Sequence, residues 1–123
     1  MDNFTKAYIE AALWSSNDDN GDPLDKNYII EDLSPQTLVN MTHDCSKFQE
    51  ENDCNLDKAY KLYPENEWTN EEQAGHDFWL TRNGHGVGFW DRGLGNIGDI
   101  LTEECKKYGS FDLYVGDDGE IYS

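Results

Sequence analysis

Four residues near the middle of the chain have side chains that can bind a metal ion or transfer a proton: His76, Asp77, His85 and Asp91. Two imidazoles with carboxylates suit zinc, iron or manganese, and a His beside an Asp can act as a base that its partner orients. The spacing of these residues matches no metalloenzyme or hydrolase signature such as HExxH or GxSxG. We therefore predict no metal and no cofactor, and keep a small metal-dependent enzyme that uses these four residues as an alternative.

Carboxylates far outnumber basic side chains in the chain as a whole. The 123 residues include 26 Asp and Glu against 9 Lys and Arg, a formal net charge of -17 at pH 7. Such a charge argues against direct binding to nucleic acid or to an anionic membrane. Eight acidic residues in two clusters are the candidate partner-binding residues, with solvated surface as the alternative for each cluster. The first cluster is Asp18, Asp19, Asp22 and Asp25, and the second is Glu65, Glu67, Glu71 and Glu72.

The number of carboxylates is comparable to the number of phosphates on DNA of the same length. A domain of this size is roughly 35 Å across, and duplex DNA of that length carries about 20 phosphates. Acidic side chains gathered on one face would offer a basic protein a surface similar to that of DNA. We therefore predict an acidic interaction protein, a monomer or small homo-oligomer, whose partner is a basic nucleic-acid-binding protein.

The central stretch, residues 75–98, holds seven of the eleven glycines and both arginines. Its glycines and paired aromatic residues are typical of architecture, and the arginines are expected to pair with Asp77, Asp91 or a tryptophan face. A partner-binding patch is the alternative, because Trp and Arg are frequent in interface hot spots. The residues to which we assign a structural role are Trp79, Arg82, Asn83, Gly84, His85, Gly86, Trp90, Asp91 and Arg92.

Helices are predicted from apolar spacing and from capping residues. The predicted segments are residues 4–14, 35–50, 56–62, a helix that begins after Thr69 and ends near Gly75 or Asp77, and 96–108. Ser34 before Pro35 is a good helix start. Thr69 and Glu72 form a capping box, in which each side chain binds the backbone amide of the other residue.

Two hairpins are predicted in the second half of the chain. The Asn83-Gly84 turn is flanked by residues 78–81 and 87–90, which are rich in strand formers, although a helix that runs on to Arg82 is the alternative. Residues 111–115 and 120–122 form the second pair of strands. The predicted fold is one α+β domain, residues 1–123, with N-terminal helices packed on a small antiparallel sheet of two hairpins separated by one helix.

The three cysteines and the hydropathy indicate the compartment. Cys45, Cys54 and Cys105 lack the paired spacing of a disulfide framework or a zinc site, and free thiols fit a reducing cytoplasm. The first residues lack the basic and apolar regions of a signal peptide, and no segment approaches 18 apolar residues. We therefore predict a cytoplasmic protein.

Three segments resemble those of a group of small bacteriophage and prophage proteins without an assigned activity. The segments are AYIEAALWSS, HDFWLTRNGHGVGFWDRGLG and DLYVGDDGEIY. The resemblance covers most of the chain and implies a bacteriophage-type accessory protein that acts in the cytoplasm of the bacterial host. Together with the acidity, this favours an inhibitor of a host nucleic-acid-binding system, anti-restriction or anti-CRISPR in type, which acts as a DNA mimic. An accessory factor of phage DNA metabolism is the alternative.

Overall fold

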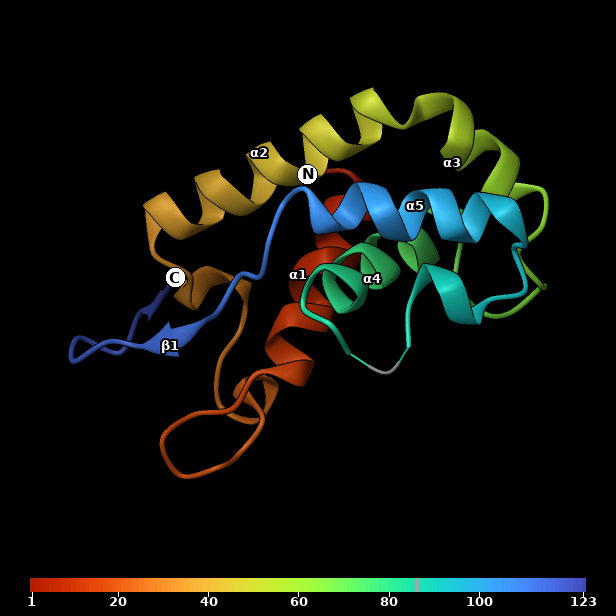
Figure 1. Ribbon diagram of the computed structural model, residues 1–123. Coiled ribbons are helices and arrows are strands. Elements are labelled where there is room, and N and C mark those ends of the chain that lie inside the picture. The colour runs from red at the N-terminus through yellow and green to blue at the C-terminus, as the bar shows by residue number, and fades with distance from the viewer. Residues whose placement is uncertain (86) are drawn as a thin grey trace.

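The protein is mostly helical and carries one small sheet. The computed structural model describes residues 1–85 and 87–123. In chain order its elements are α1 (Asn3–Ser15), the short 3-10 helices η1 (Leu24–Lys26) and η2 (Ile30–Asp32), α2 (Pro35–Glu51), α3 (Asp53–Tyr60), α4 (Asn70–Arg82), the 3-10 helix η3 (Phe89–Asp91), α5 (Asn96–Lys106), β1 (Tyr114–Val115) and β2 (Ile121–Tyr122) (Figure 1). The predicted α+β class is confirmed.

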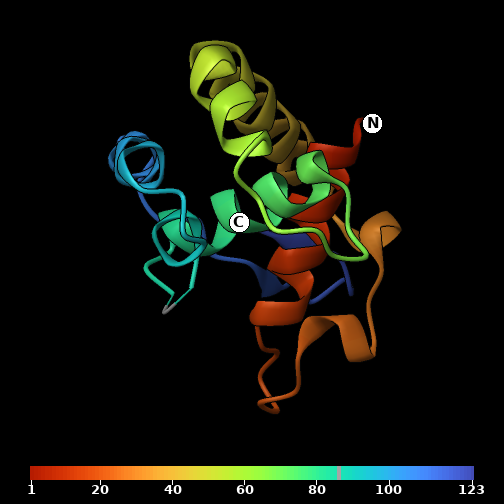
Figure 2. The ribbon, with the colours of Figure 1, turned by 90° about the vertical axis from the view of Figure 1, so that its right-hand side faces the viewer.

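Helices α1 and α4 form the centre of the molecule, and each makes its most extensive contact with the other. They cross in the middle, below the arch of α2 and α3 and beside α5 (Figures 1 and 2). The two backbones approach closely because α4 has Gly75 at the crossing, where a Cβ atom would overlap the carbonyl oxygen of Phe4. Phe78 of α4 stacks on Phe48 of α2, with ring centroids 4.1 Å apart. Three helices therefore share one aromatic core.

The predicted helix starts are present and made by the predicted residues. The Ser34 side chain accepts a hydrogen bond from an amide of the first turn of α2. Thr69 and Glu72 form both bonds of the capping box at α4, at 3.2 and 2.9 Å. These bonds satisfy amide groups that have no partner inside the helix. The residues around Ser34 and Thr69 therefore determine where α2 and α4 begin.

The first predicted hairpin is not found among the described residues. Helix α4 continues through Phe78 and Trp79 to Arg82, which is the alternative that the sequence allowed, and Asn83 ends it. The Asn83 side chain donates to the carbonyl oxygen of Trp79 and accepts from the amide of Phe111. Burial of the α4 side chains against α1 outweighs the local turn preference of Asn83-Gly84, because strand propensity depends on context. The predicted return strand is replaced by η3.

The second predicted hairpin is confirmed, and it lies at the edge of the helical core. Strands β1 and β2 pair antiparallel, with Tyr114 opposite Tyr122 and Val115 opposite Ile121. The hairpin is attached to the start of α2, where the Ser34 amide donates to the Ile121 carbonyl oxygen at 2.8 Å. The helices therefore pack mainly on one another rather than on the sheet. Within residues 1–85 and 87–123, no helix is both long and apolar enough to span a membrane.

Arg82 is buried at the end of α4, and every polar group that it contacts is an acceptor. Its side chain donates hydrogen bonds of 2.9–3.0 Å to the Tyr8 hydroxyl, an Asp44 carboxylate oxygen, and the carbonyl oxygens of Tyr108 and Gly109. Burial by itself lowers the pKa of Arg82, but Tyr8 and Asp44 outweigh it and the pKa is raised. The guanidinium therefore stays charged and links α1, α2, α4 and the segment after α5.

Aromatic rings surround the same guanidinium. Its central carbon lies 5.6 Å from the ring centroids of Phe78 and Tyr108 and 5.2 Å from that of Phe111. These distances are within the range of about 6 Å for cation–π attraction. We call Arg82 with these rings and Asp44 the Arg82 site. It combines aromatic faces and a carboxylate around one cation.

Candidate functional site

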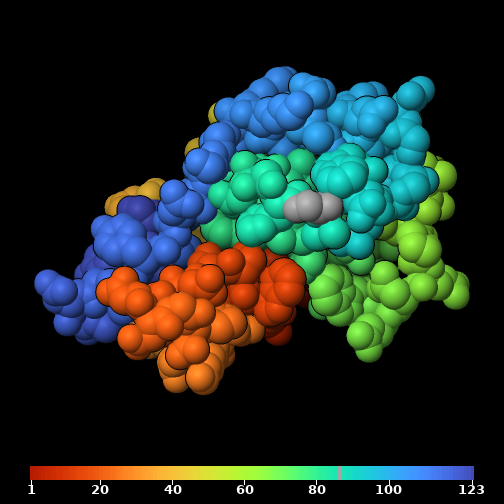
Figure 3. Space-filling model, turned by 60° about the horizontal axis from the view of Figure 1, so that its bottom comes forward, coloured from red at the N-terminus to blue at the C-terminus, as the bar shows by residue number. Residues whose placement is uncertain are grey.

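A groove of about 380 Å³ lies between α1 and α4. In the space-filling view, the N-terminal part of the chain (red and orange) and the segment before α4 (light green) stand on either side of a recess (Figure 3). The residues that line the groove come from four places in the chain: Ala7, Glu10, Ala11 and Trp14 from α1, Asp25 from η1, Trp68 from the segment before α4, and Glu72 and His76 from α4.

The groove has room beside α1 because two of the α1 residues that line it are small. Ala7, Ala11 and Trp14 are spaced by four and three residues, so they share one side of α1. The two alanines are buried and add little bulk, whereas Trp14 is 55% exposed. Trp68, on the other side, is 42% exposed. The partly exposed indole rings of Trp14 and Trp68 therefore stand beside a surface formed by Ala7 and Ala11.

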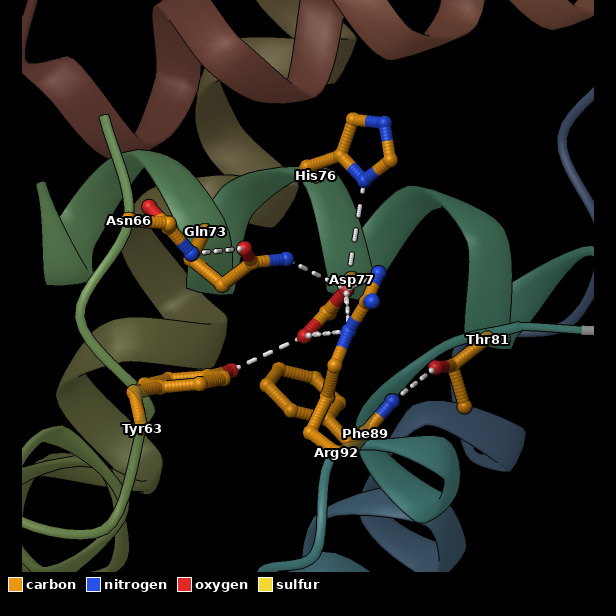
Figure 4. Close-up of polar contacts among 8 residues, drawn as sticks. All are labelled: Tyr63, Asn66, Gln73, His76, Asp77, Thr81, Phe89 and Arg92. Carbon is orange, nitrogen blue, oxygen red and sulfur yellow. Dashed lines mark hydrogen bonds and ion pairs between the residues drawn. The ribbon is translucent and has the colours of Figure 1, made fainter. Parts of the chain in front are cut away.

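His76 lies between the two tryptophans. Its ring centroid is 6.0 Å from that of Trp14 and 4.8 Å from that of Trp68. The Nδ1 atom is buried and faces an Asp77 carboxylate oxygen at 3.9 Å, and it makes no hydrogen bond with the described residues. The other ring nitrogen points away from Asp77 (Figure 4). The three rings thus form one aromatic lining.

The groove is strongly acidic. Glu10, Asp25 and Glu72 line it, and the described lining residues include no Lys or Arg. Hydrogen bonds from the Thr69 backbone and side chain, together with nearby Lys6, lower the pKa of Glu72. This carboxylate is therefore ionised at neutral pH. Exposed aromatic faces beside carboxylates are chemically suited to a cation.

A buried carboxylate, Asp77, lies on the inner side of α4 behind this groove. It is fully buried, and it accepts hydrogen bonds from the Tyr63 hydroxyl at 3.0 Å, from Gln73 at 3.1 Å and from Arg92 at 2.9 Å (Figure 4). The pKa of Tyr63 is raised by burial and by Asp77, so its hydroxyl remains a donor. The expected pairing of Arg92 with Asp77 is thus present.

Hydrogen bonds continue from Asp77 to the wall of the groove. Gln73, which donates to Asp77, accepts from the Asn66 side chain at 3.2 Å. Asn66 in turn accepts from the Trp68 amide at 2.7 Å. The backbone of Trp68 is therefore held by a chain of bonds that begins at the Arg92–Asp77 ion pair, and Figure 4 shows this chain from Arg92 to Asn66.

The two predicted acidic clusters meet at this groove. Asp25 from the first cluster and Glu72 from the second both line it. Asp18 instead accepts from the amides of Asn20 and Asp22 and holds its own loop together. The remaining predicted residues are at the surface or partly exposed: Asp19, Asp22, Glu65, Glu67 and Glu71.

The four residues considered for a metal site are not brought together. Asp77 is bound by Arg92, whereas His85 lies on a different, polar hollow beside Trp79. Asp91 is exposed on η3. Among the described residues, no group of three or more His, Cys, Asp or Glu side chains could hold a metal ion. The hypothesis of a metal site at these residues is therefore not supported by their placement.

The other residues with an assigned structural role are found in and after α4. Trp79 is 2% exposed, and its indole nitrogen donates to the Ser15 hydroxyl at 2.7 Å. Gly84 follows the helix with a φ of +70°, a conformation that favours glycine. Trp90 is exposed. Gly86 lies outside the described residues.

Sequence reasoning missed three residues of the groove: Glu10, Trp14 and Trp68. Trp14 carried a signal, because a tryptophan follows alanines on one side of a helix that otherwise reads as core. Trp68 stands beside acidic residues in a polar segment and carried none. Comparison of the chain with protein-family models, with curated proteins and with solved structures finds no match. The groove and the surface charge are therefore the basis for inferring a function.

Proposed function

We propose that the protein is an acidic, bacteriophage-type interaction protein that binds a basic nucleic-acid-binding protein of the bacterial host and inhibits it. The distribution of charge is the observation that carries this proposal. The 26 acidic side chains all lie within residues 1–85 and 87–123, and among them Asp77 is the only one that is buried. Both arginines turn inward, which leaves the seven lysines to oppose the exposed carboxylates. The ratio of acidic to basic side chains is therefore higher at the surface than in the chain as a whole.

A surface of this kind acts by occupying a groove lined with Lys and Arg. Complementary charge accelerates the encounter of two proteins and excludes partners of like charge. A DNA-binding groove that is filled by carboxylates is closed to phosphates, so the protein competes with DNA for its partner. The cytoplasm of the bacterial host and the monomeric or small homo-oligomeric state belong to the same proposal.

The alternative, an accessory factor that binds through a Trp and Arg patch in the central stretch, receives less support. Arg82 and Arg92 are both held by internal carboxylates, Asp44 and Asp77. An arginine that is already bound within the fold is a poor hot-spot residue. Trp90 alone is left exposed from that patch.

Capture from a nuclease-treated bacterial lysate tests the proposal. The tagged protein is expected to retain at least one basic nucleic-acid-binding protein at low ionic strength, because screening weakens the attraction as salt rises. Added duplex DNA should release that protein. Failure to recover any basic nucleic-acid-binding protein at low salt contradicts the proposal.

Charge reversal then locates the contact. The variant Glu65→Lys/Glu67→Lys/Glu71→Lys is expected to weaken the capture; Glu72 is left unchanged because it closes the capping box. A matched control reverses three other exposed acids, Glu50→Lys/Asp112→Lys/Asp117→Lys, which lie away from the groove. An equal loss in both variants means that the second cluster is not the contact.

A further inference from the structure

We infer that the groove between α1 and α4 binds one arginine side chain of a protein partner, with the guanidinium held against the exposed faces of Trp14 and Trp68. This deepens the proposed function and rests on it, since the side chain is assigned to the basic partner. The inference depends on three observations: the shape of the groove, its charge, and a second site in the same molecule where an arginine is already bound.

The shape of the groove fits one long side chain. Its volume of about 380 Å³ is near the lower end of the range of about 300–1,000 Å³ for small-molecule sites. The buried alanines of the floor, Ala7 and Ala11, offer an apolar surface for the methylene stem of an arginine. The exposed rings of Trp14 and Trp68 offer faces for its planar end.

The charge of the groove fits a cation that cannot lose its proton. Three carboxylates line it, and the described lining residues include His76 but no Lys or Arg. A guanidinium remains charged in proteins and can donate two parallel hydrogen bonds to one carboxylate. It is also less strongly hydrated than an ammonium and stacks on aromatic rings. Arginine is therefore expected to bind more tightly than lysine.

The Arg82 site contains the same kinds of groups with their cation in place. There, three aromatic rings lie 5.2–5.6 Å from the guanidinium carbon, and Asp44 accepts a hydrogen bond at 2.9 Å. The groove also has three rings, those of Trp14, Trp68 and His76, and its carboxylates are more numerous. The groove is thus an open counterpart of a site that this protein fills with its own arginine.

A blocked Gly-Arg-Gly peptide is the probe for the test, with the full chain and NMR detection of the tryptophan indole N–H signals. The signals of Trp14 and Trp68 are expected to shift on titration, whereas those of Trp79 and Trp90 should not. A Gly-citrulline-Gly peptide, which has the same shape without the charge, should leave all four signals unchanged. Equal shifts with both peptides, or no shift at Trp14 and Trp68, overturn the inference.

Matched variants assign the binding to the groove. Trp14→Ala and Trp68→Ala are each expected to weaken peptide binding by about tenfold, a loss between those of an exposed and a desolvated cation–π contact. Glu10→Gln/Asp25→Asn should weaken it through the charge. Trp90→Ala removes an equally exposed tryptophan outside the groove and serves as the control. A loss of binding in the control equal to that in Trp14→Ala also overturns the inference.

The same variants separate this inference from the proposed function. If the lysate capture persists unchanged in Trp14→Ala and Trp68→Ala, the groove is not the arginine site, although a basic partner exists. If the arginine peptide shifts Trp14 and Trp68 but no basic protein is captured, the groove binds arginine and the proposed partner class is wrong.

Discussion

The Arg82 site and the groove between α1 and α4 are made of similar groups, but the first is buried and the second is open to solvent. At the Arg82 site, rings and a carboxylate surround an arginine and join helices that are distant in sequence. At the groove, rings and carboxylates face solvent, and the described lining residues provide no cation. The first arrangement contributes to folding. The second leaves exposed tryptophans that the core does not need, which is the reason to assign it to binding.

Two tryptophan substitutions give the largest expected difference between these regions. Trp79→Ala removes a fully packed ring and its bond to Ser15, and is expected to lower the free energy of unfolding by about 3–5 kcal/mol. Trp14→Ala should change it by only about 0.5 kcal/mol, since that ring is mostly exposed. Urea unfolding of both variants measures the values. Similar losses in the two would show that Trp14 belongs to the core.

Removal of the internal arginine is expected to have the next largest effect. Arg82→Ala leaves the Asp44 carboxylate and two carbonyl oxygens without their donor, at a cost of about 3 kcal/mol. Arg82→Lys should recover little of this, because an ammonium has three donors and cannot bind all four acceptors. Urea midpoints of the two variants, with Glu10→Gln as a surface control, provide the check. Full recovery by lysine would contradict this account of the Arg82 site.

Gly75→Ala affects both regions at once. The added Cβ atom would overlap the Phe4 carbonyl oxygen, so α1 and α4 must move apart. We expect a loss of about 1–3 kcal/mol in the free energy of unfolding and weaker binding of the arginine peptide, because the two walls of the groove separate. Gly84→Ala is a contrasting variant, in which the added Cβ atom has open space and only its positive φ causes strain. If the folded Gly75→Ala variant binds the peptide as wild type does, the distance between α1 and α4 at their crossing does not determine the shape of the groove.

A smaller effect than that of Gly75→Ala is expected at the start of α4. Thr69→Ala removes the cap and should cost about 1 kcal/mol. Because the pKa of Glu72 is lowered in the folded protein, its contribution is present at neutral pH and is lost as the pH falls below the ordinary value of 4.5. The difference in urea midpoint between wild type and Glu72→Gln should therefore shrink in acid. Glu71→Gln, one position away, is the control, and a difference that stays constant with pH would contradict the role of Glu72.

The parts of the fold that the sequence predicted correctly are those that neighbouring residues decide. The Ser34 and Thr69 caps each form with a residue three positions away. The same holds for the inward stripe of α2, in which Met41, Cys45 and Phe48 are buried. The second hairpin also turns within five residues, 116–120. In each of these places, local preference and tertiary packing agree.

The parts that were missed depend on contacts between distant residues. Asn83-Gly84 is a good turn, but the residues before it form a helix because that helix has α1 to pack against. The groove joins α1, η1 and the segment before α4, and no spacing within one segment reveals that Trp14 and Trp68 share His76. The acidic clusters were visible in the sequence, whereas their meeting at Asp25 and Glu72 was not.

The pairing of α1 with α4 also has a consequence for how the protein is made. Helix α1 is synthesised long before α4, its main packing partner, so its apolar side has no native cover until the chain has been extended through Arg82. Translation proceeds at about 5–20 residues per second, so this interval lasts on the order of several seconds. During that time the surrounding carboxylates repel other nascent chains. The acidity of the chain is thus expected to protect the unfinished protein from aggregation.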